Sequence, residues 1–363
     1  MGPGAAVLIA ALLLWLTGVG VLGRIRRRGG NAVNSRAPAA LSIVIPARNE
    51  EHNLPVLLRS IDAQAVRGIE TIVVDDASTD DTARVARDLG ATVITARPLP
   101  DGWRGKTWAC QQGANAARSE LLLFVDADSW FEPRGLERIL SAYNGGALSV
   151  GPYHDVRKPY EQLSAFFHLM MAAGTVPHGL FGQFLLVDRE SYQCVGGHAA
   201  VKGRILENFY LAERFREAGI ATRSFTGRGV FTFRMYPDGL PELIEGWTKG
   251  FASGAGRTPK PLLFLLVAWL SGMMLAAVML IAVMLTAVVL PAAPWASLTP
   301  WASLLYLLVA AQLGVMFREV GAFTWYTALL YPVPLLFYFI VFARSVRRSG
   351  RQVTWKGRTI LAD

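Results

Sequence analysis

Three short acidic segments each follow an apolar run, and their residue types suit metal and diphosphate chemistry. The segments are IPARNEE at Ile45–Glu51, VVDDASTDDT at Val73–Thr82 and LLLFVDADS at Leu121–Ser129. Each apolar run is typical of a strand buried on both faces, and the carboxylates come where such a strand would end. Ligands of open α/β sheets bind beyond the carboxyl ends of the strands. The sequence therefore predicts that three strands bring acids to one rim, as a site for a metal and a sugar nucleotide.

The triplet DAD at Asp126–Asp128 has the DxD pattern of a divalent-cation site. Alternate side chains of an extended strand point the same way, so the two carboxylates would share one face. Hard oxygen ligands of this kind suit Mg²⁺ or Mn²⁺ bridging a diphosphate. Asp76 could accept a hydrogen bond from a base N–H or a ribose hydroxyl, or could cap a helix. Helix capping is the better interpretation for Asp80 and Asp81, which fall in a predicted first helical turn.

A loop rich in Gly and Trp, PDGWRGKTWA at Pro100–Ala109, precedes a predicted helix. Gly102 and Gly105 permit close backbone approach, and Lys106 begins the helix. The ammonium group and the helix N-terminus could then both face a phosphate. The alternative is a surface loop with a lysine at the helix start. We favour phosphate contact because two Gly and two Trp flank the lysine.

An alternation of strand and helix patterns would position these residues. It predicts an α/β fold with a mainly parallel sheet and helices on both faces. Strands are expected at 41–47, 69–77, 91–96 and 121–126, and helices at 50–64, 79–89 and 106–118. The second helix is expected to begin with Ser78 or Thr79 as its N-cap. A further helix at 160–173 could belong to the core or lie on a membrane surface.

The chain is too apolar for one soluble domain, because 52% of its 363 residues are hydrophobic. Ala5–Gly23 is an uncharged stretch long enough to span a bilayer, and RIRRR at Arg24–Arg28 follows it. A signal peptide is the alternative, but such a charge block does not follow a cleavage site. The arginines indicate that the C-terminal side of this anchor is cytoplasmic. The expected parts are an anchor at 1–23, a basic linker at 24–37, a cytosolic domain at 38–260, a membrane region at 261–343 and a basic cytoplasmic tail at 344–363.

The C-terminal membrane region contains three apolar segments, at Leu262–Leu290, Trp301–Phe317 and Ala322–Ala343. Three full crossings would export the basic tail, against the positive-inside tendency. We therefore expect one segment to be re-entrant or to lie in the interface.

The net charge of +9 does not indicate nucleic acid as a partner. The Lys and Arg residues cluster at the membrane flanks, where anionic lipid headgroups attract them. Cys110 and Cys194 form neither a metal pattern nor a disulfide framework, and we interpret both as packing residues.

Three later motifs extend the pattern to about Leu41–Gly256: GWRGKTWA, GGHAAVK at Gly196–Lys202, and RMYPDG…EGWTKGFASGA at Arg234–Ala255. With IPARNEE, VDDAS and DAD, they make the chain resemble family-2 inverting glycosyltransferases with a GT-A-type Rossmann-like fold. Within that family, the chain is most similar to carotenoid-acid glycosyltransferases of the diaponeurosporenoate type. It is more distantly similar to hopanoid-associated and ceramide glycosyltransferases.

The resemblance implies a set of site residues. For the nucleotide and the donor sugar they are Pro46, Ala47, Glu50, Asp76, Lys106 and Asp126. Asp128 would bind Mg²⁺ or Mn²⁺. The acceptor side would include His198, Arg234 and Trp247. Trp247 matches the Trp of a QxxRW motif whose Gln and Arg are replaced here by Leu243 and Gly246, which argues against processive polymer synthesis.

The proposed base position departs from the family pattern. The family uses the Asp of a Glu-Asp pair before a helix, and the pair here is Glu207-Asn208. Because Asn cannot remove a proton, Glu207 or His198 would serve instead, or the protein is inactive, or the acceptor is a carboxylate. A carboxylate is already ionised at pH 7 and needs no base. We favour this third explanation, since a neutral Asn would also not repel an incoming anion.

The resemblance thus implies a metal-dependent enzyme of the cell (inner) membrane, multi-pass, with a cytoplasmic catalytic domain. It would transfer a hexose, expected to be glucose, from a UDP-sugar to a lipid acceptor, expected to be a carotenoid carboxylic acid. Catalytic roles would fall to Asp126, Glu207 and Asn208. The alternatives are a hopanoid or polyprenyl-phosphate acceptor, or a degenerate sugar-nucleotide-binding scaffold. The intact DxD motif and Lys106 argue against the scaffold.

Overall fold

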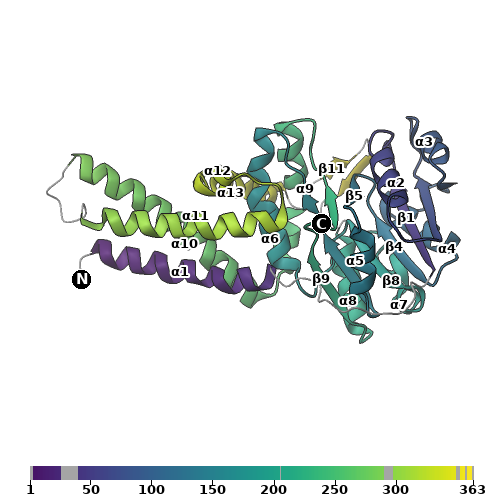
Figure 1. The fold of residues 1–363 in the computed structure, drawn as a ribbon, viewed down its shortest axis with the longest axis horizontal. Helices are drawn as coiled ribbons and strands as arrows, with labels where there is room; N and C mark the ends of the chain where they lie inside the picture. The colour runs from purple at the N-terminus through teal and green to yellow at the C-terminus, as the bar shows by residue number, and fades with distance from the viewer. Residues whose placement is uncertain are drawn as a thin grey trace. The chain divides into compact units, whose positions relative to one another are not determined.

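The computed structural model describes residues 3–25, 40–204, 206–289, 297–348, 352–355 and 358–361. The chain divides into two compact units (Figure 1). The α/β unit comprises 27–155, 175–238 and 348–363, and the helical unit comprises 1–26, 156–174 and 239–347. Two stretches of the expected 38–260 domain, 156–174 and 239–260, therefore belong to the helical unit. The expected basic linker lies almost wholly outside the described residues, as does part of the basic tail.

The α/β unit is built on a seven-stranded sheet of order β3-β2-β1-β4-β8-β6-β9. The strands are β1 Leu41–Ala47, β2 Ile69–Asp75, β3 Thr92–Thr95, β4 Leu121–Val125, β6 Ala147–Gly151, β8 Phe184–Asp188 and β9 Thr222–Thr226. All neighbours pair in parallel except β8, which is antiparallel to β4 and β6. A smaller sheet has the order β5-β10-β7, from β5 Ser129–Phe131, β10 Phe231–Phe233 and β7 Tyr153–His154. The predicted mainly parallel α/β fold is confirmed, with β1 at its predicted bounds.

Two hydrophobic cores, one on each face, hold helices against the large sheet. Ile43 and Ile45 of β1 enter one core, and Val44 enters the other, because successive side chains of a strand point to opposite faces. The helices of the first face are α2 Leu54–Asp62, α3 Thr82–Asp88 and α5 Gly135–Ala142. Those of the second face are α4 Gly105–Ala116, α7 Arg189–Cys194, η2 Gly197–Val201 and α8 Glu207–Glu217. The continuous apolar run of β1 is thus buried on both faces, as predicted.

The predicted N-cap of α3 is wrong. The helix begins at Thr82 with Asp81 at its N-cap, because the residues predicted to cap it bond elsewhere. The Ser78 hydroxyl accepts a hydrogen bond from the Asn49 N–H at 3.0 Å, and the Thr79 N–H donates to Asn49 Oδ1 at 2.8 Å. A contact with the neighbouring loop therefore overrides the local capping preference.

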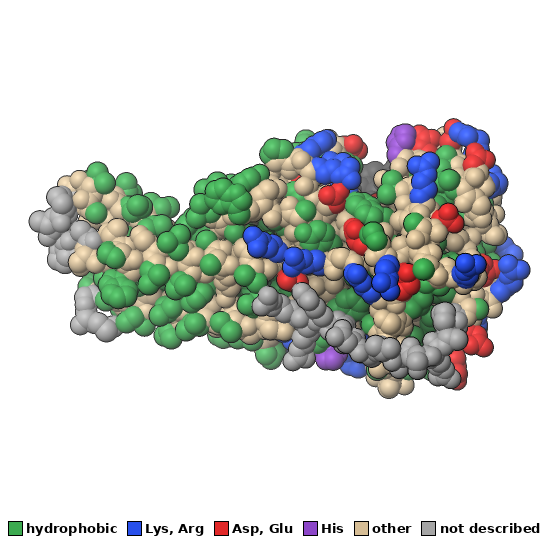
Figure 2. All heavy atoms as spheres, in the orientation of Figure 1, with side chains coloured by type: hydrophobic (Ala, Val, Ile, Leu, Met, Phe, Trp, Pro, Cys, Tyr) green, Lys and Arg blue, Asp and Glu red, His purple; other side chains and the backbone are tan. Residues whose placement is uncertain are grey.

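Among its described residues, the helical unit contains three helices long and apolar enough to cross a membrane: α1 Pro3–Ile25, α10 Lys260–Val289 and α11 Thr299–Val320. The other helices are η1 Pro159–Ser164, α6 Ala165–Thr175, α9 Leu240–Arg257, α12 Trp325–Leu329 and α13 Pro332–Arg348. Figure 2 shows hydrophobic side chains spread over the face of the long helices, where few charged side chains are seen. The third apolar segment expected in the membrane region is divided into α12 and α13.

The predicted helix at 160–173 forms as η1 and α6, and its aromatic residues belong to the core of the helical unit. Phe166 and Phe167 are fully buried. The Phe166 ring lies 5.4 Å from that of Phe317, and the Phe167 ring stacks on Trp247 at 4.7 Å. Of the two locations considered, the core is therefore confirmed for these side chains.

Glycines let α1 and α10 approach each other closely, as small residues do between membrane helices. A Cβ atom at Gly18 would lie 2.1 Å from Nε1 of Trp269, and one at Gly272 would lie 2.6 Å from the backbone N of Trp15. Trp269 is fully buried and donates from Nε1 to Gln312 Oε1 of α11 at 3.0 Å. These contacts pack α1, α10 and α11 side by side (Figure 1).

We expect Gly18→Ala to destabilise the purified protein by about 1–3 kcal/mol, because the new methyl group displaces the fixed Trp269 ring. Gly20→Ala is the matched control, since nothing lies within 4 Å of a Cβ there. Thermal unfolding in detergent should give a lower midpoint for the Gly18 variant alone. Equal midpoints for the two variants would contradict this packing.

Candidate functional site

The loops that follow β1 and β2 are joined by hydrogen bonds into one rim. The bonds run from Arg48 Nη1 to Asp76 O (2.7 Å), Asn49 N to Ser78 Oγ (3.0 Å), Thr79 N to Asn49 Oδ1 (2.8 Å), Glu50 N to Thr82 Oγ1 (2.8 Å), Glu51 N to Asp80 Oδ2 (3.2 Å) and Asp81 N to Glu51 Oε2 (2.9 Å). Asn49 and Ala77 have φ angles of 55° and 54°, which residues with a Cβ seldom adopt. The cross-links hold these conformations, so the rim is preorganised.

The carboxylates of the rim differ in their surroundings. Burial alone would raise the pKa of Asp80, but hydrogen bonds from Thr82 and from the Glu51 N–H outweigh it and lower that pKa. Asp80 therefore fastens the loops as an ionised group. The Glu50 carboxylate accepts from Asn53 Nδ2 at 2.7 Å. Asp76 and Ala47, two residues expected near the nucleotide, are buried at the strand ends that carry the rim.

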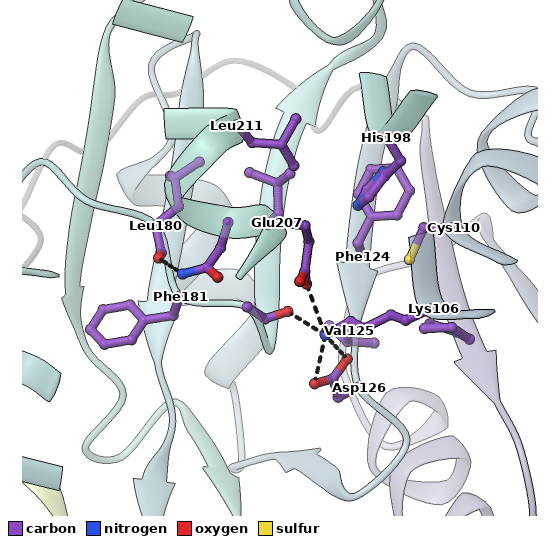
Figure 3. Close-up of a pocket in the computed structure, with 14 residues that line it drawn as sticks. Lys106, Cys110, Phe124, Val125, Asp126, Leu180, Phe181, His198, Glu207 and Leu211 are labelled. Atoms are coloured by element: carbon purple, nitrogen blue, oxygen red, sulfur yellow. Dashed lines mark hydrogen bonds and ion pairs between the residues drawn. The ribbon is translucent and has the colours of Figure 1, made fainter. Parts of the chain in front are cut away.

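A pocket opens where β4 ends, between α4, α8 and the segment before β8 (Figure 3). Its lining residues are Pro46, Lys106, Cys110, Phe124, Val125, Asp126, Leu180, Phe181, Gly182, Leu185, His198, Glu207, Asn208 and Leu211. Six of the residues expected in the site are therefore brought together: Pro46, Lys106, Asp126, His198, Glu207 and Asn208. Ala47, Glu50, Asp76, Asp128, Arg234 and Trp247 are not among the lining residues.

The ammonium group of Lys106 is the centre of this pocket. It lies 2.7 and 2.9 Å from the two carboxylate oxygens of Asp126, 2.9 Å from the Gly182 carbonyl and 3.4 Å from Glu207 Oε1 (Figure 3). Burial alone would lower the pKa of Lys106, but the charges of Asp126 and Glu207 more than offset it and raise that pKa. Lys106 is thus a permanent cation that joins two acidic side chains and one loop.

Glu207 is the first residue of α8 and is buried, with 7% of its surface exposed. Burial raises its pKa, the charge of Lys106 acts against this, and the charge of Asp126 adds to it, so the net shift is upward. A carboxyl group in a pocket whose pKa is shifted by burial and by a charged partner is a candidate acid or base. Glu207 is therefore the residue of the Glu-Asn pair that has the properties of an acid or base.

Asn208 has a different role, because its amide is a hydrogen-bond donor to the main chain. Nδ2 donates to the Leu180 carbonyl at 2.6 Å. A carboxylate at this position would place two oxygen acceptors against each other. The loop that contains Leu180 is also held by Lys106 at the Gly182 carbonyl and by the Asp126 N–H at the Gln183 carbonyl, at 2.9 and 3.1 Å. Asn208 thus fixes one wall of the pocket.

His198 is held as a neutral imidazole. Nδ1 lies 2.8 Å from the Tyr192 hydroxyl, which also accepts from the His198 N–H at 3.0 Å, and the ring packs edge-on against Phe124. Burial, with a contribution from the charge of Lys106, lowers the pKa of His198 to about 3. A group with so low a pKa is a poor base at neutral pH, so His198 does not suit the base role that the sequence left open for it.

The DxD triplet lies in a turn, so the prediction that strand alternation puts its carboxylates on one face is wrong. Strand β4 ends at Val125 and β5 begins at Ser129, and the Ser129 hydroxyl donates to the Asp126 carbonyl at 2.5 Å to close the turn. Asp126 lines the pocket and is bound by Lys106. Asp128, two residues later, is half-buried and is not among the lining residues.

A divalent cation fits this donor set only together with a ligand. In the described part of the chain, no three His, Cys, Asp or Glu side chains are close enough to hold a metal by themselves. Mg²⁺ and similar ions commonly take one or two carboxylates and complete their shell with phosphate oxygens and water. The hard oxygens of Asp128 and of the neighbouring rim suit a cation that arrives with a diphosphate.

Two residues expected on the acceptor side, Trp247 and Arg234, are not among the pocket-lining residues. Trp247 belongs to α9 of the helical unit and is buried against Phe167, and Arg234 follows β10 in the α/β unit. Sequence analysis missed the wall formed by Leu180–Gln183. That wall acts through backbone carbonyl groups, which carry no residue-type signal.

Comparisons with known proteins agree with this fold. Residues 42–196 match the family model described as glycosyl transferase family 2. The chain is 35% identical over 337 residues to the 4,4'-diaponeurosporenoate glycosyltransferase of Staphylococcus aureus, with 88% of each chain covered. It is 38% identical over 264 residues to the Staphylococcus haemolyticus protein of that name, with 68% of this chain and 69% of the relative covered.

A solved structure shares the fold. The mannosyltransferase PcManGT from Pyrobaculum calidifontis, in complex with GDP-Man and Mn²⁺, superposes with a TM-score of 0.56 at 19% identity. The match covers 93% of this chain and 99% of the mannosyltransferase.

We expect acid to destabilise the wild type more than a His198→Asn variant. The folded-state pKa of His198, about 3, lies below its ordinary value of 6.5, so the unfolded chain binds the extra proton between these pH values. Stability is then lost as pH falls through 6.5, by about 2 kcal/mol at pH 5. Thermal unfolding at pH 7.5 and 5.0 measures this, with His52→Asn, at a side chain 93% exposed, as the control. An equal acid effect in wild type and His198→Asn would contradict the buried neutral state.

Proposed function

This chain belongs to glycosyltransferase family 2, with a GT-A-type fold, and we propose that it transfers a hexose from a UDP-sugar to the carboxylate of a carotenoid acid. Glucose is the first candidate for the sugar. The names of relatives 35% and 38% identical to this chain support the acceptor. The observation that carries the proposal is the hydrogen bond from Asn208 Nδ2 to the Leu180 carbonyl, because it fixes a neutral amide where other members have a base.

The donor nucleotide would bind along the preorganised rim. Asp76 stands where β2 ends and would accept from the base or the ribose, with Pro46, Ala47 and Glu50 beside it. The rim lies beyond the carboxyl ends of β1 and β2, where α/β sheets bind ligands. The mannosyltransferase that shares this fold was solved with GDP-Man and Mn²⁺, which supports a nucleotide sugar and a divalent cation here. Asp128 would hold Mg²⁺ or Mn²⁺, which when bound would stabilise the charge of the departing diphosphate.

The sugar would lie in the pocket, where the carboxyl oxygen of the acceptor attacks the anomeric carbon. The new ester bond forms as the bond to the β-phosphate oxygen breaks, and configuration is inverted. The negative charge of the acceptor carboxylate ends on the departing UDP, and the ester is neutral. The total charge is unchanged, so no proton has to leave the nucleophile. Asp126 and Glu207 would accept from sugar hydroxyl groups. Lys106 offsets one of their two negative charges and so makes the pocket tolerate an incoming anion.

A polyprenyl phosphate is the second candidate acceptor, because it is an anion too and needs no base. A hopanoid alcohol is less suitable, since its hydroxyl proton must be removed and Asn208 cannot accept it. The names of the relatives favour the carotenoid acid. A degenerate scaffold would have no use for a charged pocket at the end of β4.

The catalytic unit would act at the cytoplasmic surface of a cell membrane. Trp269 of α10 bonds to Gln312 in the C-terminal half of α11, and Val283, nearer the end of α10, shares a hydrophobic cluster with Ala302 near the start of α11. A Cβ at Gly18 of α1 would meet Trp269, and one at Gly272 would meet Trp15. These pairs make α10 antiparallel to both neighbours. The C-terminal end of α1, the start of α10 and the end of α11 then share one side, with Arg24 and Arg318 at helix ends there. The positive-inside tendency makes this side cytoplasmic.

We expect Asn208→Asp to lower kcat/KM toward a carotenoid acid by about tenfold or more. The new carboxylate loses the bond to the Leu180 carbonyl and repels the acceptor, at about 1 kcal/mol or more for each effect. Asn144→Asp, at an exposed position, is the matched control for the charge change. Assays with the acid and with its alcohol analogue would measure both rates.

The opposite result would show that a base is used. If the acceptor is an alcohol and Glu207 removes its proton, Asn208→Asp would preserve or raise the rate, and Glu207→Gln would lower it by about 10²–10⁴-fold. Faster transfer to the acid by the Asn208→Asp variant than by the wild type would eliminate the carboxylate proposal.

We expect Asp128→Ala to abolish sugar transfer and leave the fold intact, because Asp128 lies in a turn and outside both cores. Release of UDP from UDP-glucose with acceptor present measures turnover across a Mn²⁺ titration. Asp62→Ala removes an exposed carboxylate at the end of α2 and should keep wild-type turnover. Wild-type activity of Asp128→Ala at saturating Mn²⁺ would remove Asp128 from the metal site.

A further inference from the structure

The chain that follows α11 runs back along it. The Phe323 ring lies 5.7 Å from that of Phe317. Farther on, a Cβ at Gly314 would lie 3.7 Å from the Cβ of Ala328. The hydroxyl of Tyr306 then donates to the Leu329 carbonyl at 2.6 Å. Successive residues after α11 therefore meet successively earlier turns of α11.

The turn between α12 and α13 lies deep beside the two long helices. Tyr331 donates from its hydroxyl to the Met273 carbonyl of α10 at 3.0 Å, and its ring lies 4.9 Å from that of Tyr306. Tyr306 lies 14 residues before the last residue of α11, and Met273 lies 13 residues after the first residue of α10. At a rise of 1.5 Å per residue, Tyr306 lies about 20 Å from the C-terminal end of α11, and Met273 lies about 20 Å from the N-terminal end of α10.

Helix α13 runs back toward the C-terminal end of α11. Its Tyr338 ring lies 6.4 Å from Phe166, which packs against Phe317 near the end of α11. Closer to its C-terminus, the Ser345 hydroxyl donates to the Thr248 carbonyl of α9 at 2.8 Å. The segment 321–348 therefore goes in and comes out on one side of the helical unit.

The backbone at the turn is suited to a place without water. The first four residues of a helix lack intrahelical partners for their N–H groups. In α13, Pro332 and Pro334 have no N–H group, as suits the start of a helix, while Val333 N donates to Leu330 O and Leu335 N to Tyr331 O, each at 3.0 Å. At the end of α12, the Leu329 carbonyl accepts from Tyr306. Non-helical backbone is tolerated at membrane depth where neighbouring protein satisfies it in this way.

The outer face of this segment is apolar. Leu330, Val333, Leu336 and Ile340 are 54%, 59%, 55% and 59% exposed. In α13, basic residues occur in its last turns, Arg344 among them. The exposed apolar face near the turn thus suits contact with acyl chains. The basic residues in the last turns of α13 suit contact with lipid headgroups.

We propose that α12–α13 is a re-entrant hairpin whose partner is the acyl chains of a single leaflet. It enters from the side on which α11 ends, turns at Leu330–Pro332 inside the bilayer, and leaves on that same side. The proposal requires α10 and α11 to span the membrane but does not depend on the sugar or the acceptor. It returns Arg344 and the C-terminal end of α13 to the side of Arg24.

Cysteine labelling in vesicles of known orientation tests the hairpin. Cys194 is exposed and is replaced by Ser, while the buried Cys110 stays. Single cysteines are then introduced as Leu330→Cys at the turn, Val346→Cys at the end of α13, and Ser297→Cys just before α11. We expect a membrane-impermeant maleimide to label Ser297→Cys and Val346→Cys from opposite sides, and Leu330→Cys from neither.

A fluorophore attached to Leu330→Cys by a permeant maleimide should be quenched most by lipids brominated deep in their acyl chains. Labelling of Val346→Cys from the side of Ser297→Cys would mean a full crossing, and labelling of Leu330→Cys by the impermeant reagent would mean a surface helix. A shielded Leu330→Cys that brominated lipids do not quench would mean a protein partner, such as a second copy of this chain. Each of these three results overturns the proposal, and wild-type turnover in every variant would leave the proposed function untouched.

Discussion

The ion pair of Lys106 with Asp126 and Glu207 is the interaction on which the rest of the site depends. Lys106 comes from the start of α4, Asp126 from the end of β4, and Glu207 from the start of α8, and the same ammonium group holds the Gly182 carbonyl. One half-buried cation thus fixes four segments of the chain around a single pocket. Without it, two carboxylates would face each other in a poorly solvated place, where like charges repel strongly.

The charge balance of this pocket links the fold to the chemistry. Two of its polar side chains carry no charge: burial keeps His198 neutral, and the amide of Asn208 is held in place by its hydrogen bond to the Leu180 carbonyl. The rim formed by the loops after β1 and β2 is held separately, by its own cross-links. In the proposed function, the rigid rim would bind the nucleotide beside a pocket that tolerates an anion, an arrangement suited to transfer to a carboxylate. The helical unit, with three helices able to span a bilayer, suits an acceptor that is a lipid.

Much of the fold could be predicted from the sequence, because the first strands are continuous apolar runs with acids at their ends. Strand β1 has its predicted bounds, and β4 is one residue shorter than predicted. Errors came where distant contacts decide the local structure. Asn49 takes Ser78 and Thr79 away from the helix N-cap, and Ser129 turns the DxD triplet out of its strand. Neither effect follows from local propensity. The ion pairs of Lys106 with residues 20 and 101 positions away in the sequence could not be predicted either, and its contact with phosphate stays a prediction.

The absence of a base is the central claim, and the pH dependence of wild-type kcat/KM toward a carotenoid acid tests it most directly. If the acceptor carboxylate attacks unaided, the profile should rise only with the ionisation of the acceptor, below about pH 5, and should be flat from about pH 6 to 9. Glu207→Gln should keep that shape, whatever it does to the absolute rate. A rise with an inflection between about pH 6 and 8 that disappears in Glu207→Gln would show that the enzyme removes a proton, and would contradict the account.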